Sequence, residues 1–253
     1  MSRISIAFLA AFAMLMLGSA AVSGAFSPSE EEPQMMESIA SNWAGYVINA
    51  NPSGLHNGSV TAVSGSWIVP KLNCSKSLDS YSVFWVGIDG YSSKTVEQAG
   101  TSAHCLLGRP MYYAWYEAYP NSPERVNMRI SPGDNISAEV RYIGNGMFRL
   151  TLNDTTTGTE FSTIERSEKA ERSSAEWIAE APFYSDGVLP LADFGEVYFT
   201  NAKAEINGVT GSIKTASQEY ERITMYTSEN ILGMQPANLS EDGSSFQILW
   251  QHQ

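Results

Sequence analysis

Short runs in which apolar and polar residues alternate recur along the chain from Ile39 to its end, and Gly, Pro, Asn, Asp and Ser separate them. A period of two places successive side chains on opposite faces of a strand. The clearest runs cover residues 42–48, 60–69, 81–88, 111–118, 137–143, 148–152, 196–199, 222–226 and 246–250. Their number and spacing predict an all-β protein, either a sandwich or a closed barrel.

Only residues 165–172 have a composition that favours helix, being rich in Glu, Lys, Ala and Arg. The segment has no apolar stripe, so we expect a polar loop. Directly after it, residues 175–180 alternate with a period of two, which predicts a strand.

The chain begins with one positive charge, an apolar run over residues 4–17 and a small-residue stretch over residues 18–25. This order is typical of a secretory signal peptide, and the run is shorter than the ~20 residues of a membrane-spanning helix. We therefore expect cleavage after Ala25, with a cut after Ala20 as the alternative, a secreted product and no membrane association after cleavage. Residues 26–38 combine prolines with an acidic cluster, which predicts a flexible leader or short pro-segment. Residues 39–253 are expected to form one β-sandwich domain.

The formal net charge is −12, and only 17% of the residues are charged. Binding to nucleic acid or to anionic lipid needs a basic surface, so neither partner is expected. Few Lys and Arg remain to repel one another once carboxylates neutralise in acid, which favours tolerance of low pH. Nothing in the pattern calls for a second subunit, and we expect a monomer.

The chain has two cysteines, Cys74 and Cys105. Since an exported protein passes through oxidising surroundings, we expect them to form a disulfide, although two buried thiols are the alternative. Five Asn-x-Ser/Thr triplets mark surface loops where the host glycosylates; they begin at Asn57, Asn73, Asn135, Asn153 and Asn238.

Common hydrolase signatures are missing from the sequence. The three histidines, His56, His104 and His252, are isolated, so a histidine-based zinc site is not expected. There is no Gly-x-Ser-x-Gly elbow, no pair of Asp-Thr/Ser-Gly motifs and no glycine-rich phosphate loop. A disulfide would also remove the thiol nucleophile. We expect neither a metal nor a cofactor.

Four segments combine aromatic residues with polar residues that a structural strand does not need, namely residues 41–46, 85–90, 113–120 and 175–180, and residues 96–100 lie between the second and third. Alternation within a strand places Glu117 on the face of Tyr113 and Trp115, and Glu176 on the face of Ile178 and Glu180. Gln98 and Glu97 then face opposite sides, and we expect Glu97 to be solvated.

These segments resemble the glutamic peptidases, also called eqolisins. The matching pieces occur in order and are Ser41-Asn42-Trp43-Ala44-Gly45, Trp85-Val86-Gly87-Ile88-Asp89-Gly90, Gln98-Ala99-Gly100, Ala114-Trp115-Tyr116-Glu117, Ala175-Glu176-Trp177-Ile178 and Asp193-Phe194-Gly195. The resemblance implies a concanavalin-like or jelly-roll-like β-sandwich of two large antiparallel sheets, with a polypeptide substrate lying across a concave face. It also implies that Gln98 and Glu176 are catalytic.

The resemblance places three further residues near the pair: Trp85, Asp89 and Glu117. Trp43 and Tyr113 are expected to support the site or to contact substrate. An ionised Glu176 would take a proton from water and return it to the leaving amine, while Gln98 would stabilise the oxyanion and hold the water. An acid optimum then needs a second group that works protonated, for which Glu117 and Asp89 are the candidates.

Two other functions fit the same residues. Glu117 and Glu176 could serve as the two carboxyls of a sandwich-type glycoside hydrolase, with aromatic side chains stacking on sugar rings. The aromatic groove could also belong to a lectin-like module that binds without turnover.

Overall fold

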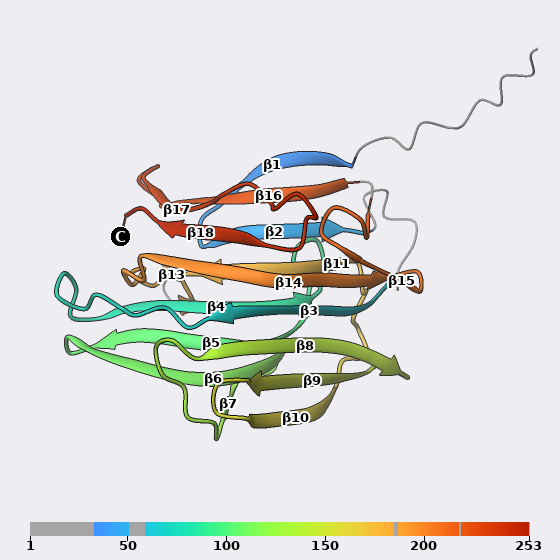
Figure 1. Ribbon diagram of the computed structural model, residues 1–253, viewed down its shortest axis with the longest axis horizontal. Coiled ribbons are helices and arrows are strands. Elements are labelled where there is room, and N and C mark those ends of the chain that lie inside the picture. Colours follow the sequence, from blue (N-terminus) through green and yellow to red (C-terminus); the bar gives the residue numbers. More distant parts are fainter. Residues whose placement is uncertain (1–32, 51–58, 185–186, 218, 253) are drawn as a thin grey trace, which may run out of the picture. The chain divides into compact units, whose positions relative to one another are not determined.

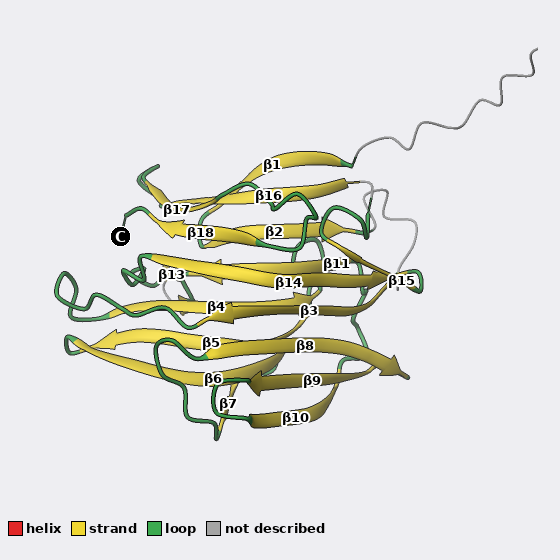
Figure 2. Cartoon of the chain, in the orientation of Figure 1, coloured by secondary structure: helices red, strands yellow, loops and turns green. Residues whose placement is uncertain are grey.

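Eighteen strands make up the regular structure of the residues that the computed structural model describes, which are 33–50, 59–184, 187–217 and 219–252 (Figures 1 and 2). The strands are β1 (Gln34–Ala40), β2 (Trp43–Asn49), β3 (Val60–Ile68), β4 (Ser80–Ile88), β5 (Val96–Leu106), β6 (Arg109–Tyr119), β7 (Glu124–Val126), β8 (Asn135–Gly144), β9 (Met147–Asp154), β10 (Thr159–Arg166), β11 (Ser174–Glu180), β12 (Phe183–Tyr184), β13 (Gly187–Val188), β14 (Glu196–Ile206), β15 (Val209–Ser212), β16 (Glu219–Tyr226), β17 (Leu232–Pro236) and β18 (Phe246–Trp250). Within these ranges no helix is long and apolar enough to cross a membrane.

The larger strands form two layers that face each other, as Figure 1 shows. One layer has the order β10-β9-β8-β3-β14-β18-β17, and the other has the order β16-β2-β11-β4-β5-β6-β7. The pairing of β16 with β17 joins the layers along one edge. The β-sandwich expected from the resemblance is confirmed.

The core lies between the two layers. Trp67 and Phe199 project from the first layer, and Phe84 and Trp177 project from the second; all four are fully or almost fully buried. The two indole N–H groups donate hydrogen bonds across the layers, from Trp67 to Thr101 Oγ1 at 2.9 Å and from Trp177 to the Ser64 carbonyl at 2.8 Å. Each indole therefore buries apolar area while its single donor stays satisfied.

The nine strands expected from alternation are all present; most ends differ by a few residues, but β14, expected over 196–199, continues to Ile206. The strand expected over residues 175–180 is β11, and the polar loop before it begins after Arg166. In β11, Ala175, Trp177 and Ala179 face the core. The other face of β11 is buried as well, because further side chains and loops cover the outer side of this sheet.

One expected segment boundary needs correction. The flexible leader was expected over residues 26–38, but β1 begins at Gln34 and pairs in parallel with β16. The strand forms because the edge of β16 offers unpaired backbone groups, which overrides the local composition. The expected signal peptide, the first part of the leader and Asn57 lie outside the described residues.

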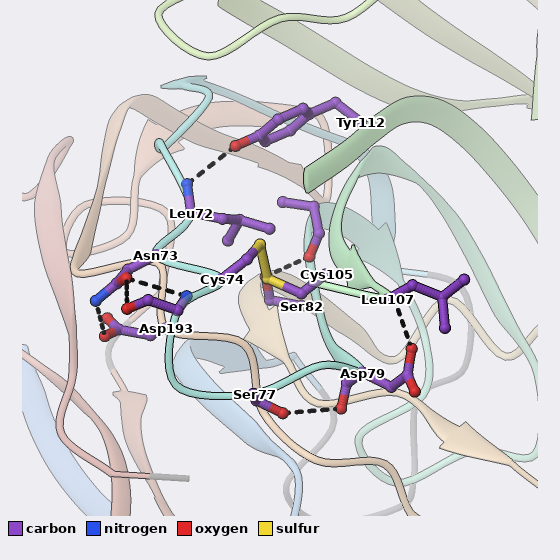
Figure 3. The surroundings of a disulfide bond; sticks show 12 residues. Leu72, Asn73, Cys74, Ser77, Asp79, Ser82, Cys105, Leu107, Tyr112 and Asp193 are labelled. Carbon is purple, nitrogen blue, oxygen red and sulfur yellow. Dashed lines mark hydrogen bonds between the residues drawn. A yellow bond between two sulfur atoms is a disulfide. The ribbon is translucent and has the colours of Figure 1, made fainter. Parts of the chain in front are cut away.

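The expected disulfide between Cys74 and Cys105 is present, with the two Cα atoms 5.5 Å apart. Figure 3 shows that it joins the loop before β4 to the end of β5. In the same region the Tyr112 hydroxyl accepts a hydrogen bond from the Leu72 backbone N–H at 2.9 Å. Asp79 accepts one from the Leu107 N–H at 3.0 Å. The first contact ties β6 to the loop before β4, and the second holds the turn between β5 and β6.

Candidate active site

A cleft of about 1170 Å³ lies on the outer face of the second sheet. Its floor consists of alternate residues of three neighbouring strands, namely Tyr81 and Val83 of β4, Gln98, Ser102 and His104 of β5, and Tyr113, Trp115 and Glu117 of β6. Residues Pro123–Arg125, the residues of β12 and Leu189 also line it. A cleft that follows strands over this length suits an extended chain better than a small molecule.

The register of four adjacent strands brings three of the predicted polar residues into one row. Glu176 of β11 lies opposite Gly87 of β4, Gly87 lies opposite Gln98 of β5, and Gln98 lies opposite Glu117 of β6. Directly opposed residues of antiparallel strands point to the same face. Strands are about 4.8 Å apart, so the backbones at Glu176 and Gln98 are separated by roughly 10 Å, a gap that two long side chains can span.

Glycines leave the space that this row needs. A Cβ on Gly87 would lie 2.9 Å from the Trp85 ring and 3.2 Å from Gln98 Cβ. A Cβ on Gly100 would lie only 2.2 Å from the Phe84 carbonyl oxygen. Gly100, the glycine of Gln98-Ala99-Gly100, is therefore required by the close approach of β4 and β5.

Gln98 is held by a second residue of the row. Its Nε2 donates a hydrogen bond to Glu117 Oε2 at 2.6 Å, whereas its Oε1 is buried and has no hydrogen-bond partner in the described part of the chain. Burial raises the pKa of Glu117, and the hydrogen bond from Gln98 opposes that rise. The free Oε1 is an acceptor that a water molecule or a substrate N–H can fill.

Glu176 does not line the cleft itself. Its side chain is fully buried, and neither carboxyl oxygen has a hydrogen-bond partner among the described residues. Burial raises its pKa well above the ordinary value, and the charges of Asp89 and Glu97 add to the rise. The Ser174 hydroxyl and the Tyr91 backbone N–H lie near enough to lower the pKa partly. Glu176 is therefore a carboxyl that keeps its proton in acid.

The sequence reasoning did not identify Glu180 as part of the site. Glu180 lines the cleft, where it accepts hydrogen bonds from Trp85 Nε1 at 2.9 Å and from Asn42 Nδ2 at 3.1 Å. Burial raises its pKa to about 7. Alternation could have pointed to Glu180, because it lies four residues after Glu176 and therefore on the same face of one strand.

The predicted aromatic residues divide into two groups. Trp43 and Tyr113 line the cleft. Trp85 is fully buried beneath it, with its ring centroid 5.1 Å from that of Trp43 in an edge-to-face contact. Trp85 therefore acts through Glu180 and Trp43, which it orients.

Asp89 does not line the cleft, but it lies near enough to Glu176 for its charge to raise the pKa of that carboxyl. Its carboxylate accepts hydrogen bonds from the backbone N–H groups of Glu171, Arg172 and Ser173, at 2.7–2.8 Å, and from the Ser173 hydroxyl at 2.9 Å. Every one of these donors belongs to the loop before β11. Asp89 therefore anchors the loop that leads into β11, the strand that carries Glu176.

Glu97 was expected to be solvated, and this expectation is wrong. Its side chain is fully buried, both carboxyl oxygens lack a hydrogen-bond partner within the described ranges, and burial raises its pKa to about 8. The reason is that the face of β5 opposite the cleft points into the sandwich. Alternation separated Glu97 from Gln98 correctly, but it could not show that both faces of the strand are covered.

Among the described residues, no group of three or more His, Cys, Asp and Glu side chains has an arrangement that could hold a metal ion.

Comparison with known proteins agrees with the resemblance seen in the motifs. The chain matches the Peptidase A4 family over residues 41–241. Aspergillopepsin-2 of Aspergillus niger is 32% identical over 198 residues, which are 69% of this chain and 67% of that protein. The solved structure of scytalido-glutamic peptidase with a peptide-based transition state analog has a TM-score of 0.67 at 26% identity, covering 83% of this chain and 98% of that one. Aspergilloglutamic peptidase from Aspergillus niger has a TM-score of 0.61 at 26% identity, covering 68% and 99% of the two chains.

Proposed function

Because the chain belongs to the Peptidase A4 family of glutamic peptidases, and is therefore a peptide hydrolase, we propose that it is an acid-acting endopeptidase whose catalytic pair is Gln98 and Glu176. Its substrates are polypeptides. The observation that carries the proposal is the strand register, which aligns the backbones of Glu176, Gly87, Gln98 and Glu117 across four adjacent strands.

Glu176 transfers protons in this proposal. A protonated carboxyl has one O–H donor and one acceptor oxygen, so it can give its proton to the amide nitrogen while the other oxygen accepts a proton from the attacking water. The bond from water oxygen to carbonyl carbon forms, the C–N bond breaks, and Glu176 ends the cycle protonated. The raised pKa of Glu176 supports this starting state, which the sequence left open.

Gln98 stabilises the oxyanion in the same step. Its amide N–H can point at the developing negative charge, and its unpartnered Oε1 can hold the water. Since an amide does not titrate, Gln98 adds no charge beside Glu176, and repulsion between two carboxylates is avoided. Glu117, which accepts the hydrogen bond from Gln98, positions that amide.

The same carboxyls account for action in acid. Burial raises the pKa of Glu117 and of Glu176, and it raises that of Glu180 to about 7. All three hold protons in acid and ionise as the pH rises, which places negative charge around the oxyanion. Activity is therefore expected to fall on the way to neutral pH.

Substrate reaches Glu176 only if its cover moves. The backbone of Tyr91 lies beside the buried carboxyl, and Tyr91 packs with Val96 and Ile178 on the same apolar cluster. The loop between β4 and β5 is therefore the segment that would open when a peptide enters the cleft.

The other two functions are not favoured. The family model that the chain matches and the relative Aspergillopepsin-2 point to peptide hydrolysis and not to glycoside hydrolysis. Binding alone does not require a buried carboxyl without hydrogen-bond partners, such as that of Glu176.

Digestion of a denatured protein between about pH 2 and pH 7 tests the proposal, since free carboxyls and histidines titrate in that range. Glu176→Gln is expected to reduce turnover by about 10² to 10⁴, and Gln98→Ala by about 10² to 10³. Glu97→Gln is the matched control, because it changes the neighbouring carboxyl on the opposite face and should retain activity in acid. An active Glu176→Gln enzyme would refute the mechanism.

We also propose that the chain is exported, on the basis of the signal peptide expected over residues 1–25. The amino-terminal residue of the mature protein in culture medium tests this. Retention of residues 1–25 in cells would contradict it.

A further inference from the structure

The end of the cleft remote from Glu176 holds a cluster of rings and one cation that the proposed reaction does not use. Tyr81, His104, Tyr113 and Arg125 line it, and they come from four consecutive strands, β4 to β7. We call this group the distal subsite. His104 lies six residues after Gln98 on β5, which is roughly 20 Å at 3.3 Å per residue.

The rings of the distal subsite hold the cation in place. The His104 ring lies edge-on between two tyrosines, with centroids 4.8 Å from Tyr81 and 5.2 Å from Tyr113. The guanidinium carbon of Arg125 lies 4.4 Å from the Tyr113 ring centroid. Arg125 pairs across from Trp115, so its side chain is on the cleft face. A guanidinium stacked in this way keeps its N–H groups directed sideways, where they can bind an anion.

Within the part of the chain that the structure describes, one group of the distal subsite makes no hydrogen bond and another makes no ion pair. His104 Nε2 is buried and makes no hydrogen bond within the described ranges. Arg125 makes no ion pair there either, although Glu124 is its neighbour in the chain and lines the same cleft. Buried polar atoms normally have a partner, so His104 Nε2 points to a partner from outside the chain, and Arg125, which is exposed, is accessible to the same ligand.

The cluster suits a negatively charged ligand. Burial, with the charge of Arg125 as a second cause, lowers the pKa of His104 to about 4. Above that pH Arg125 carries the charge of the cluster, and a neutral imidazole can still donate one hydrogen bond. A carboxylate accepts both a bidentate guanidinium contact and an imidazole N–H.

Building on the endopeptidase function proposed above, we propose that the distal subsite binds a carboxylate of the substrate polypeptide, from an Asp or Glu side chain or from the chain's own carboxyl terminus. An extended substrate has nearly the same rise per residue as β5. The recognised residue should therefore lie about four to six positions from the scissile bond, and on one side of it only.

Matched peptides test the proposal. A peptide cut at a mapped bond is made with Glu or with Gln, one position at a time, on both sides of the bond, and kcat/KM is measured. At about pH 5 the Glu peptide should be cut about tenfold faster at one remote position, as expected for one charge-assisted contact. At about pH 2.5 the preference should disappear, because the substrate carboxyl is then protonated. A peptide that ends at that position, as free acid or as amide, separates the terminal carboxylate from the side-chain source.

Variants complete the test. Arg125→Gln should bring the Glu peptide down to the level of its Gln counterpart, and Arg125→Lys should restore part of the preference. Arg129→Gln removes the same charge from an exposed position that does not line the cleft, so it should keep the preference. Equal rates for the Glu and Gln peptides, or a preference that survives Arg125→Gln, would overturn the subsite. If no peptide at all is cleaved, the endopeptidase function itself fails, and the subsite fails with it.

Discussion

Glu97 gives the sharpest test of how this fold responds to pH. The carboxyl is fully buried, its two oxygens have no hydrogen-bond partner in the described part of the chain, and its pKa is raised to about 8. Glu97→Gln replaces it with a side chain of the same shape that cannot ionise. We expect the variant to be more stable than the wild type at neutral pH and nearly equal to it in acid.

The magnitude follows from the two pKa values. The folded protein holds this proton up to about pH 8, whereas the unfolded chain releases it near the ordinary value of 4.5. Because the folded state binds the extra proton, stability is full below the unfolded pKa and falls as the pH rises toward the folded one. Between about pH 4 and pH 7 this carboxyl alone should lower the free energy of unfolding by about 3 kcal/mol, given its pKa of about 8.

Urea or guanidinium unfolding at several pH values measures this difference. All proteins should carry Gln98→Ala, which is expected to lower turnover by about 10² to 10³ and so limits self-digestion during the experiment. Glu160→Gln is the matched control, because Glu160 lies on a strand and is exposed. It removes the same charge without removing a buried carboxyl.

The reasoning would be refuted if Glu97→Gln and the control lost the same stability between acid and neutral pH. That result would mean that the folded protein ionises Glu97 as easily as the unfolded chain does. It would require solvent to reach a carboxyl that is fully enclosed, or the neighbouring Ser167 side chain to lower its pKa more strongly than it does here.

Three further predictions concern the core, the disulfide and the pH profile. Thr101→Val leaves the buried Trp67 N–H without its acceptor and should cost about 1–3 kcal/mol of unfolding free energy, whereas unchanged stability would mean that another acceptor takes over. Replacing both Cys74 and Cys105 with Ala should cost roughly 3 to 4 kcal/mol in the same assay, and a much smaller loss would show that the turn contacts around Tyr112 suffice. Glu117→Gln keeps an acceptor for Gln98 but cannot ionise, so activity should extend to higher pH; an unchanged profile would assign the acid requirement to other carboxyls.

Predictions that depend only on alternation along one strand agree with the structure. Alternation correctly separated Ala175 and Trp177, which face the core, from Glu176 and Ile178 on the outer face. It succeeds because successive side chains of any extended backbone point in opposite directions. The same rule places Glu180 on the face of β11 that carries Glu176, and it could have identified Glu180 as a member of the site.

Predictions were less accurate where a residue's surroundings depend on a part of the chain that is distant in sequence. Asp89 matches a motif of the family, but its carboxylate is used by a loop that lies more than 80 positions later in the chain. Gln34–Ala40 is a strand only because β16 lies beside it. Neither partner can be identified from the residues next to the segment itself.

The amino-acid sequence by itself determined the all-β class, the disulfide partners and the side chains that share a face within each strand. These properties follow from local geometry, from the presence of only two cysteines and from motifs that are legible in order along the chain. The tertiary structure decided that Glu176, Gln98 and Glu117 lie in one row, that Glu97 faces the interior and that Arg125 lies on Tyr113. Those outcomes depend on strand register and on the packing of a second sheet, which are set by contacts between residues far apart in the chain.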